Sequence, residues 1–236
     1  MFACDFADVD RFLERHSVAY ALEGHLRSNS SWAREYADYW NIWRLADPVQ
    51  RMDKLLEIVR YNRWNMNRQG QCEKIQNGIS RGEIGPYQLA AFWSCVDGLS
   101  RYRLREMPAY SPDQLAQMKG VLDGLLDTLC EWHPSAGTIT FLSKVILMFN
   151  WGETPALDQR VRSVLGLRGQ PLMSTYVEIL KDLGSWVTQH ERREGVRLDQ
   201  QVTDYMVARL DGLLGEIPIG RALDMVLFPL ADYPSD

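Results

Sequence analysis

Apolar side chains recur every three or four residues along most of this chain, and this spacing constrains the fold more than any other feature. In residues 113–132, leucine and methionine keep that spacing at positions 115, 118, 122, 125, 126 and 129. A period near 3.6 residues indicates a helix with one buried side, whereas a half-buried strand requires alternation. Ser111 and Pro112 precede the stripe, and both residue types suit a helix start. The pattern predicts an all-α protein.

The same spacing predicts helices in other parts of the chain. They are residues 9–27, 48–61, 87–104, 138–149, 159–165, 174–193, 199–214 and 219–228. Breaks are expected at 62–85, 106–112, 133–137 and 166–171, which contain Gly, Asn or Pro. No break resembles a long flexible linker, so residues 1–236 are expected to form a single multi-helix domain. A subdivision into residues 1–110 and 111–236 stays open.

Charge and composition argue against several classes of function. The net charge of -5 does not suit a protein that coats nucleic acid through bulk charge, although it allows a local basic face. The four cysteines and four histidines are dispersed without metal-ligand spacing, so no metal and no other cofactor is expected. The start of the chain lacks a secretory pattern, and no apolar run reaches the roughly 20 residues that span a bilayer. We therefore expect a cytoplasmic protein with no membrane partner.

Lys144 is the single ionisable residue in the otherwise uncharged segment 138–149. A helix that is apolar all round is normally buried, and the neighbours of Lys144 on its own side, Phe141 and Met148, offer no counter-charge. Burial lowers the pKa of an ammonium group, and a neutral amine is the nucleophile that Schiff-base chemistry requires. The alternative is that Lys144 extends its long stem to the surface. The sequence leaves both alternatives open.

Asp158 follows Pro155 and comes directly before the predicted helix 159–165. This position predicts an N-cap, where the carboxylate accepts a hydrogen bond from the first helical turn and the helix dipole favours its ionised form. Capping is a sufficient reason for an aspartate here. An ionised, fixed carboxylate can also stabilise positive charge that develops on a sugar. The two roles are compatible.

Three segments carry a resemblance to a known family: the turn at 133–137 (HPSAG), residues 141–144 (FLSK) and residues 155–161 (PALDQRV). Together they resemble the helix-hairpin-helix DNA glycosylase superfamily, especially its 8-oxoguanine glycosylase-like branch, over about residues 113–168. The resemblance implies two helical parts that flank a cleft. It also implies a DNA glycosylase with AP lyase activity, in which a base flips out of the duplex, Lys144 attacks the sugar C1′ atom and Asp158 stabilises the transition state.

The resemblance further implies contacts with double-stranded DNA that carries a damaged or modified base. The residues expected to contact backbone phosphates are Gly137, Arg160, Arg162 and Arg168. The residues expected to line the base pocket are Met148, Asp224 and Phe228. Each arginine could equally belong to a solvated basic face. The sequence does not identify the base.

A second function stays open beside the enzyme. A non-catalytic helical interaction or defence protein could retain a glycosylase-like fold without its chemistry. The acidic net charge favours this alternative. The position of the Lys144 amine relative to the Asp158 carboxylate is the structural feature that distinguishes the enzyme from the non-catalytic protein.

Overall fold

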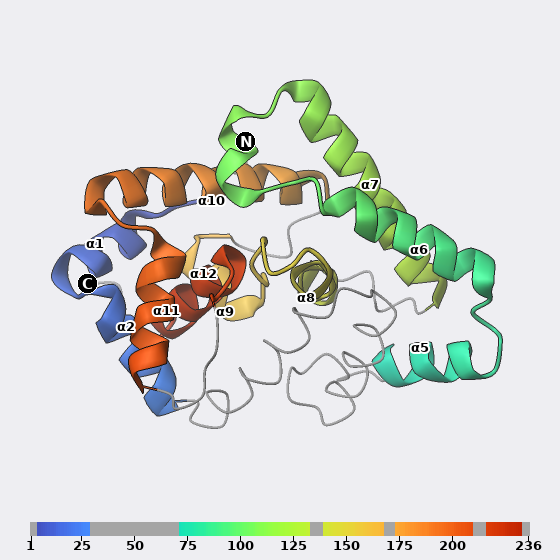
Figure 1. Cartoon of the computed structure of the whole chain (residues 1–236), viewed down its shortest axis with the longest axis horizontal. Coiled ribbons are helices and arrows are strands. Elements are labelled where there is room, and N and C mark those ends of the chain that lie inside the picture. The colour runs from blue at the N-terminus through green and yellow to red at the C-terminus, as the bar shows by residue number, and fades with distance from the viewer. Residues whose placement is uncertain (1–3, 29–70, 133–138, 168–172, 210–215, 233–236) are drawn as a thin grey trace.

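A computed structural model describes residues 4–28, 71–132, 139–167, 173–209 and 216–232 (Figure 1). All regular secondary structure in these ranges is helical, which confirms the predicted all-α class. The helices are α1 Ala7–Arg15, α2 Val18–Ser28, α5 Gln71–Ser80, α6 Pro86–Leu99, the 3-10 helix η1 Leu104–Ala109, α7 Pro112–Trp132, α8 Ile139–Phe149, α9 Gln159–Val164, α10 Met173–Glu194, α11 Leu198–Arg209 and α12 Ile219–Leu230. None of these described helices is long and apolar enough to cross a membrane.

Helix α7 begins and ends within one residue of its predicted bounds. The Gln114 backbone N–H donates to Ser111 Oγ at 3.3 Å, and the Ser111 N–H donates to Gln114 Oε1 at 2.8 Å. This reciprocal pair is a capping box, which satisfies two donors that a helix start otherwise leaves unpaired. The predicted stripe of α7 is buried or partly buried, and the helix packs along α6 (Figure 1).

Several predicted bounds are wrong. The predicted helix 9–27 is two helices, because the chain turns to an extended conformation at His16 and restarts after Ser17, whose side chain accepts from the Tyr20 N–H. The predicted break at 62–85 contains α5, where Gly78 lets the Ile84 side chain approach the helix closely. Helix α6 ends at Leu99, before its predicted bound, and η1 occupies part of the predicted break at 106–112. The predicted helix 48–61 lies outside the described residues.

Helix α12 lies at the centre of the C-terminal half. Every residue from Ile219 to Leu227 is buried, and the helix contacts α2, α9 and α11. In Figure 1 it lies beside α9 and α11, left of the middle of the view. A helix that is buried on all sides is normally apolar all round. Its two charged residues, Arg221 and Asp224, are therefore exceptions that need an explanation.

Helices η1 and α10 join the segments before and after residue 110. Gly184 of α10 packs against the Leu104 carbonyl so closely that a side chain there would overlap it. Arg105 of η1 also donates to Glu191 of α10 at 2.7 and 2.9 Å. Buried apolar residues from both sides of residue 110 belong to one core cluster. The number of domains stays a prediction.

Candidate active site

Lys144 is buried in α8, with 9% of its surface exposed. All side chains from Phe141 to Leu147 are buried as well, so the helix lies inside the protein at this point. The structure thus supports the buried alternative rather than a lysine extended into solvent. Burial lowers the pKa of the Lys144 amine, an effect that Asp158 and Asp224 oppose and Arg221 reinforces. All three of these groups therefore lie within electrostatic range of the amine.

Asp158 is the N-cap of α9, as its sequence position predicts. Its backbone is extended, and its Oδ1 accepts a hydrogen bond from the Val161 N–H at 3.0 Å. The preceding residue, Leu157, is tied to α8: its N–H donates to Ser143 Oγ at 2.9 Å, and its carbonyl accepts from the Thr140 hydroxyl at 3.5 Å. These contacts fix the segment that carries Asp158 to the helix that carries Lys144.

The turn between α8 and α9 has a left-handed backbone at two successive residues. Trp151 has a φ of 52° and Gly152 a φ of 71°. Gly152 N–H donates to the Leu147 carbonyl at 3.0 Å, which closes the turn against the end of α8. A positive φ is uncommon for a residue as bulky as tryptophan and persists only where the surrounding structure enforces it.

Helix α12 meets this turn through its own glycine. Gly220 N–H donates to the Gly152 carbonyl at 2.8 Å. A Cβ atom on Gly220 would lie 2.5 Å from the Thr154 carbonyl oxygen, so only glycine fits without movement. The start of α12 is therefore held against the turn that links Lys144 with Asp158.

Arg221 and Asp224 follow Gly220 on α12 and form an ion pair. Arg221 is 1% exposed and Asp224 is 7% exposed. The pKa of Asp224 is raised to about 6, mainly because the carboxyl is buried; Arg221 and Lys144 oppose the rise, and Asp158 adds to it. The pKa values of Lys144 and Asp224 are thus both influenced by Asp158 and Arg221, and we call these two cations and two carboxylates the charge cluster.

The charge cluster brings together three residues that the sequence singled out and one that it missed. Lys144 and Asp158 were expected to share a site, and Asp224 was expected to lie in the pocket beside them. Arg221 was not considered. Its signal was present, because Arg221 and Asp224 are the charged pair in the otherwise uncharged segment 217–230, the same anomaly that marks Lys144.

Chemically, the cluster combines an amine that gives up its proton more easily than usual with two carboxylates, Asp158 at the start of α9 and Asp224 on α12. Such an amine can attack an electrophilic carbon, and a carboxylate with a pKa near neutrality can take up or return a proton.

No protein-family model, curated protein or solved structure matches the chain. The functional argument therefore depends on the geometry of the cluster and on the motifs in the sequence.

Two predicted phosphate contacts also have structural roles. Arg160 pairs with Asp232, and its guanidinium lies 4.5 Å from the ring centre of Phe228. Arg162 is 8% exposed and donates to the Asp158 carbonyl at 3.2 Å. Burial lowers the pKa of Arg162, and Asp158 opposes this effect. Both arginines thus hold the region around Asp158 in place, and their contact with DNA stays a prediction.

Some predicted site residues lie outside what the structure describes. Gly137 and Arg168 fall in the undescribed ranges, and the side chain of Met148 in α8 is not described. Phe228 is half-buried at the end of α12, beneath Arg160.

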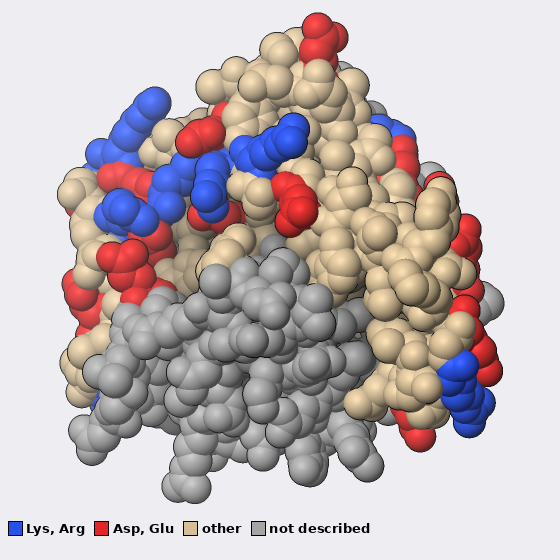
Figure 2. All heavy atoms as spheres, turned by 45° about the vertical axis from the view of Figure 1, so that its right-hand side comes forward, with Lys and Arg blue, Asp and Glu red and all other residues tan. Residues whose placement is uncertain are grey.

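The described surface carries no broad field of one sign on the face seen in Figure 2. Basic and acidic side chains are interspersed there. The described side chains of this face therefore provide little long-range attraction for DNA, and binding through them would depend on individual contacts.

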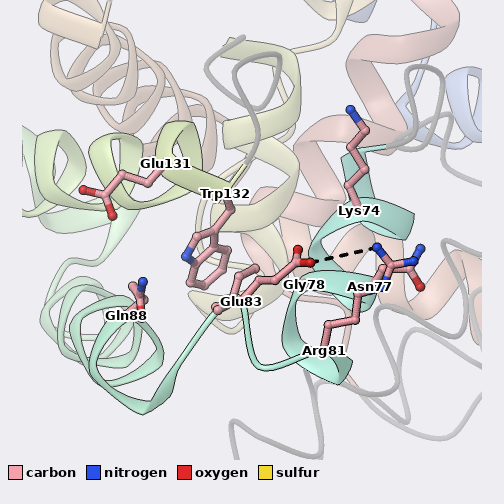
Figure 3. A pocket seen from close by; sticks show the side chains of 9 residues that line it. Lys74, Asn77, Gly78, Arg81, Glu83, Gln88, Glu131 and Trp132 are labelled. Carbon is pink, nitrogen blue, oxygen red and sulfur yellow. Dashed lines mark ion pairs between the residues drawn. The ribbon is translucent and has the colours of Figure 1, made fainter.

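A cavity of about 350 Å³ lies elsewhere, between α5, the start of α6 and the end of α7 (Figure 3). Its lining includes Trp132, Gln88 and the ion pair of Arg81 with Glu83 at 3.9 Å. None of the charge cluster residues lines it. It is an open, mostly polar depression.

Proposed function

We propose that this protein is a DNA glycosylase with AP lyase activity, which removes a damaged or modified base through a Schiff base on Lys144. The observation that carries the proposal is the buried Lys144 amine, its pKa lowered by burial, in one cluster with Asp158 and Asp224. The segments around Lys144 and Asp158 also resemble the corresponding parts of helix-hairpin-helix glycosylases. A cytoplasmic location belongs to the same proposal.

The first step is attack by the neutral Lys144 amine on C1′ of a nucleotide flipped out of the duplex. The bond between C1′ and the base nitrogen breaks, and the base leaves with the bonding electrons and takes up a proton. The amine, now bonded to C1′, passes its extra proton to a carboxylate of the cluster. Asp158, fixed as an N-cap, stabilises the positive charge that develops on the sugar.

The second step converts the sugar adduct to a Schiff base. The bond from C1′ to the ring oxygen breaks, and that oxygen takes up a proton while an iminium forms at C1′. Loss of a proton from C2′ then expels the 3′ phosphate and cuts the strand. Water hydrolyses the imine and restores the Lys144 amine, so no oxidant or reductant is needed.

The base pocket of the proposal is formed by Asp224, Phe228 and Met148. Asp224 can accept a hydrogen bond when ionised and donate one when protonated, and its pKa of about 6 makes both forms accessible near neutral pH. Phe228 offers an aromatic surface. The phosphate contacts are assigned to Gly137, Arg160, Arg162 and Arg168 on double-stranded DNA.

The proposal is tested with duplex oligonucleotides that each carry one damaged or modified base, including 8-oxoguanine. We expect wild-type protein to cut at least one of them without added alkali, and Lys144→Gln to cut none. Lys119→Gln is the matched control, since Lys119 lies on the surface of α7 in an ion pair with Asp123 at 2.5 Å. Failure of the wild-type protein on the whole panel would favour the non-catalytic alternative.

A further inference from the structure

His190 is a buried titratable residue of α10, close to the contact of this helix with α1. Its side chain is 3% exposed, and its ring stacks on the ring of Trp186, with the ring centres 5.1 Å apart. Trp186 stacks in turn on Phe6, the residue directly before α1, at 5.5 Å. The three rings form one column, which encloses the imidazole where α1 lies beside α10 (Figure 1).

Asp10 is the residue of α1 that binds α10 through its side chain. Its Oδ1 atom accepts a hydrogen bond from Trp186 Nε1 at 3.1 Å and another from Arg193 Nη2 at 3.3 Å. The same Nη2 atom lies 3.2 Å from Nδ1 of His190. One guanidinium nitrogen thus joins the imidazole of α10 to the carboxylate of α1. We call Asp10, Trp186, His190 and Arg193 the latch.

The hydrogen bonds of the latch fit the neutral form of His190. An arginine nitrogen is always a donor, so Nδ1 of the imidazole accepts and the ring proton lies on Nε2. Nε2 is enclosed, and no group in the described part of the chain accepts a hydrogen bond from it. A second proton would go to Nδ1, where two donors would then face each other. Arg193 would have to move away, and its hydrogen bond to Asp10 would break.

Four charged groups lie within electrostatic range of His190, and burial outweighs their sum. They are Asp10 on α1 and Glu191, Arg193 and Glu194 on α10. Glu191 is engaged by Arg105 of η1 at 2.7 Å. Glu194 pairs with Arg193 at 3.3 Å. Burial lowers the pKa of His190 from its ordinary value of 6.5, Arg193 lowers it further, and the three carboxylates oppose this effect.

We propose that the latch is a pH-sensitive switch, in which protonation of His190 in mild acid displaces Arg193 and loosens α1 from α10. The switch does not depend on the proposed Schiff-base chemistry. Its effect reaches α9, because the Asp5 N–H, just before α1, donates to the Leu165 carbonyl at 3.0 Å. Leu165 is the C-cap of the helix that Asp158 begins. Release of α1 would thus remove a restraint on that helix.

Amide hydrogen exchange of the full chain between about pH 5 and 7.5 tests the switch. Exchange is followed helix by helix, because Asp224, with a pKa of about 6, changes the stability of the whole fold in the same range. A group that is neutral in the closed form and charged in the open form favours opening by up to about tenfold for each pH unit below its ordinary pKa. Corrected for its intrinsic rate, exchange in α1 should accelerate as pH falls below 6.5, relative to exchange in α7. Equal pH dependence in the two helices would overturn the proposal.

Two histidine variants assign the response to one residue. His190→Phe keeps an aromatic ring on Trp186 and removes the titrating group, so the acceleration in α1 should be lost. His16→Phe is the matched control, since His16 follows α1 directly and stacks on Tyr20 at 4.6 Å. This control should respond to acid as wild type does. An acid response that persists in His190→Phe, or one that disappears in His16→Phe, would overturn the proposal.

The imidazole of His190 provides a second measurement, which holds if His190→Phe does not fold. The chain has four histidines, so the ring signals of His190 can be identified by NMR through their proximity to Trp186. They are titrated in wild type and in Arg193→Gln, a change at a half-exposed side chain. The wild-type midpoint should lie below 6.5 and move to higher pH in Arg193→Gln, because the arginine charge lowers the pKa of His190. A wild-type midpoint at or above 6.5, or the same midpoint in both proteins, would overturn the proposal.

Discussion

The hydroxyl of Ser143 accepts a hydrogen bond from the backbone N–H of Leu157 at 2.9 Å, which ties the residue before Lys144 to the residue before Asp158. Lys144 and Asp158, the two residues proposed to act in the reaction, thus each follow directly after a partner of this buried hydrogen bond. The separation of Lys144 from Asp158 is set by the tertiary structure as well as by the length of the intervening turn.

Ser143→Ala should destabilise the protein and lower its activity. The variant leaves the buried Leu157 N–H without its acceptor, which costs about 1–3 kcal/mol. Urea unfolding measures the loss, and strand cleavage at a stability-matched temperature measures the effect on the site. Ser80→Ala is the control, because Ser80 is exposed on α5 and donates to the Gln76 carbonyl within its own helix. Equal stability of both variants would contradict the proposed anchoring.

Gly220→Ala should be strongly destabilising, by about 1–3 kcal/mol or more, because the new methyl group would overlap the backbone at Thr154. Gly120→Ala in α7 is the control, and the opposite effect is expected there because no atom lies within 4 Å of the added Cβ atom. There the substitution should stabilise by roughly 0.5–1 kcal/mol through better helix propensity. A mild effect at Gly220 would show that α12 is not held closely against the turn.

Asp158 has a capping role and a proposed chemical role, and two substitutions separate them. Asn is as good an N-cap as Asp, so Asp158→Asn should unfold close to wild type, whereas Asp158→Ala should lose about 1 kcal/mol. Strand cleavage should fall about a hundredfold or more in both variants, since both lose the carboxylate. Full activity in a stable Asp158→Asn protein would restrict Asp158 to capping.

The raised pKa of Asp224 makes stability depend on pH in a defined window. The folded carboxyl has a pKa of about 6 against an ordinary value of 3.8, so the folded state binds more protons between these values. The free energy of unfolding should therefore fall as pH rises from about 4 to 6, by up to about 3 kcal/mol from this group. The free energy of unfolding of Asp224→Asn, measured with urea across the same pH range, should lack this decrease. An equal slope of the free energy of unfolding against pH in Asp224→Asn and in wild type would contradict the role given to Asp224.

Local signals account for the parts of the fold that the sequence predicted well. Helix α7 has both a start signal at Ser111 and Pro112 and a regular apolar stripe, and its bounds follow from them. The break between α1 and α2 was missed because no Gly or Pro marks it, since residues 9–23 contain neither. Helix α5 was missed because the Gly and Asn residues of 62–85 suggested a break, whereas the small size of one of them, Gly78, allows close packing against Ile84.

The sequence predicted those residues of the candidate site whose type is unusual in its segment or whose position has a known structural role. Lys144 is conspicuous in an apolar helix, and Asp158 occupies a standard capping position. The partnership with Arg221 could not be derived in this way, because it depends on the contact of Gly220 with Gly152, 68 positions apart in the chain. Only the folded structure brings α12 to the Lys144 turn.

Covalent capture of DNA by Lys144 tests the central claim most directly. Wild-type protein is incubated with a duplex that contains one abasic site, sodium borohydride reduces any Schiff base to a stable amine, and peptide mapping locates the attached residue. We expect an adduct on Lys144 that persists in Lys119→Gln and is lost in Lys144→Gln. No adduct with the wild-type protein, or an adduct that survives Lys144→Gln, would contradict it.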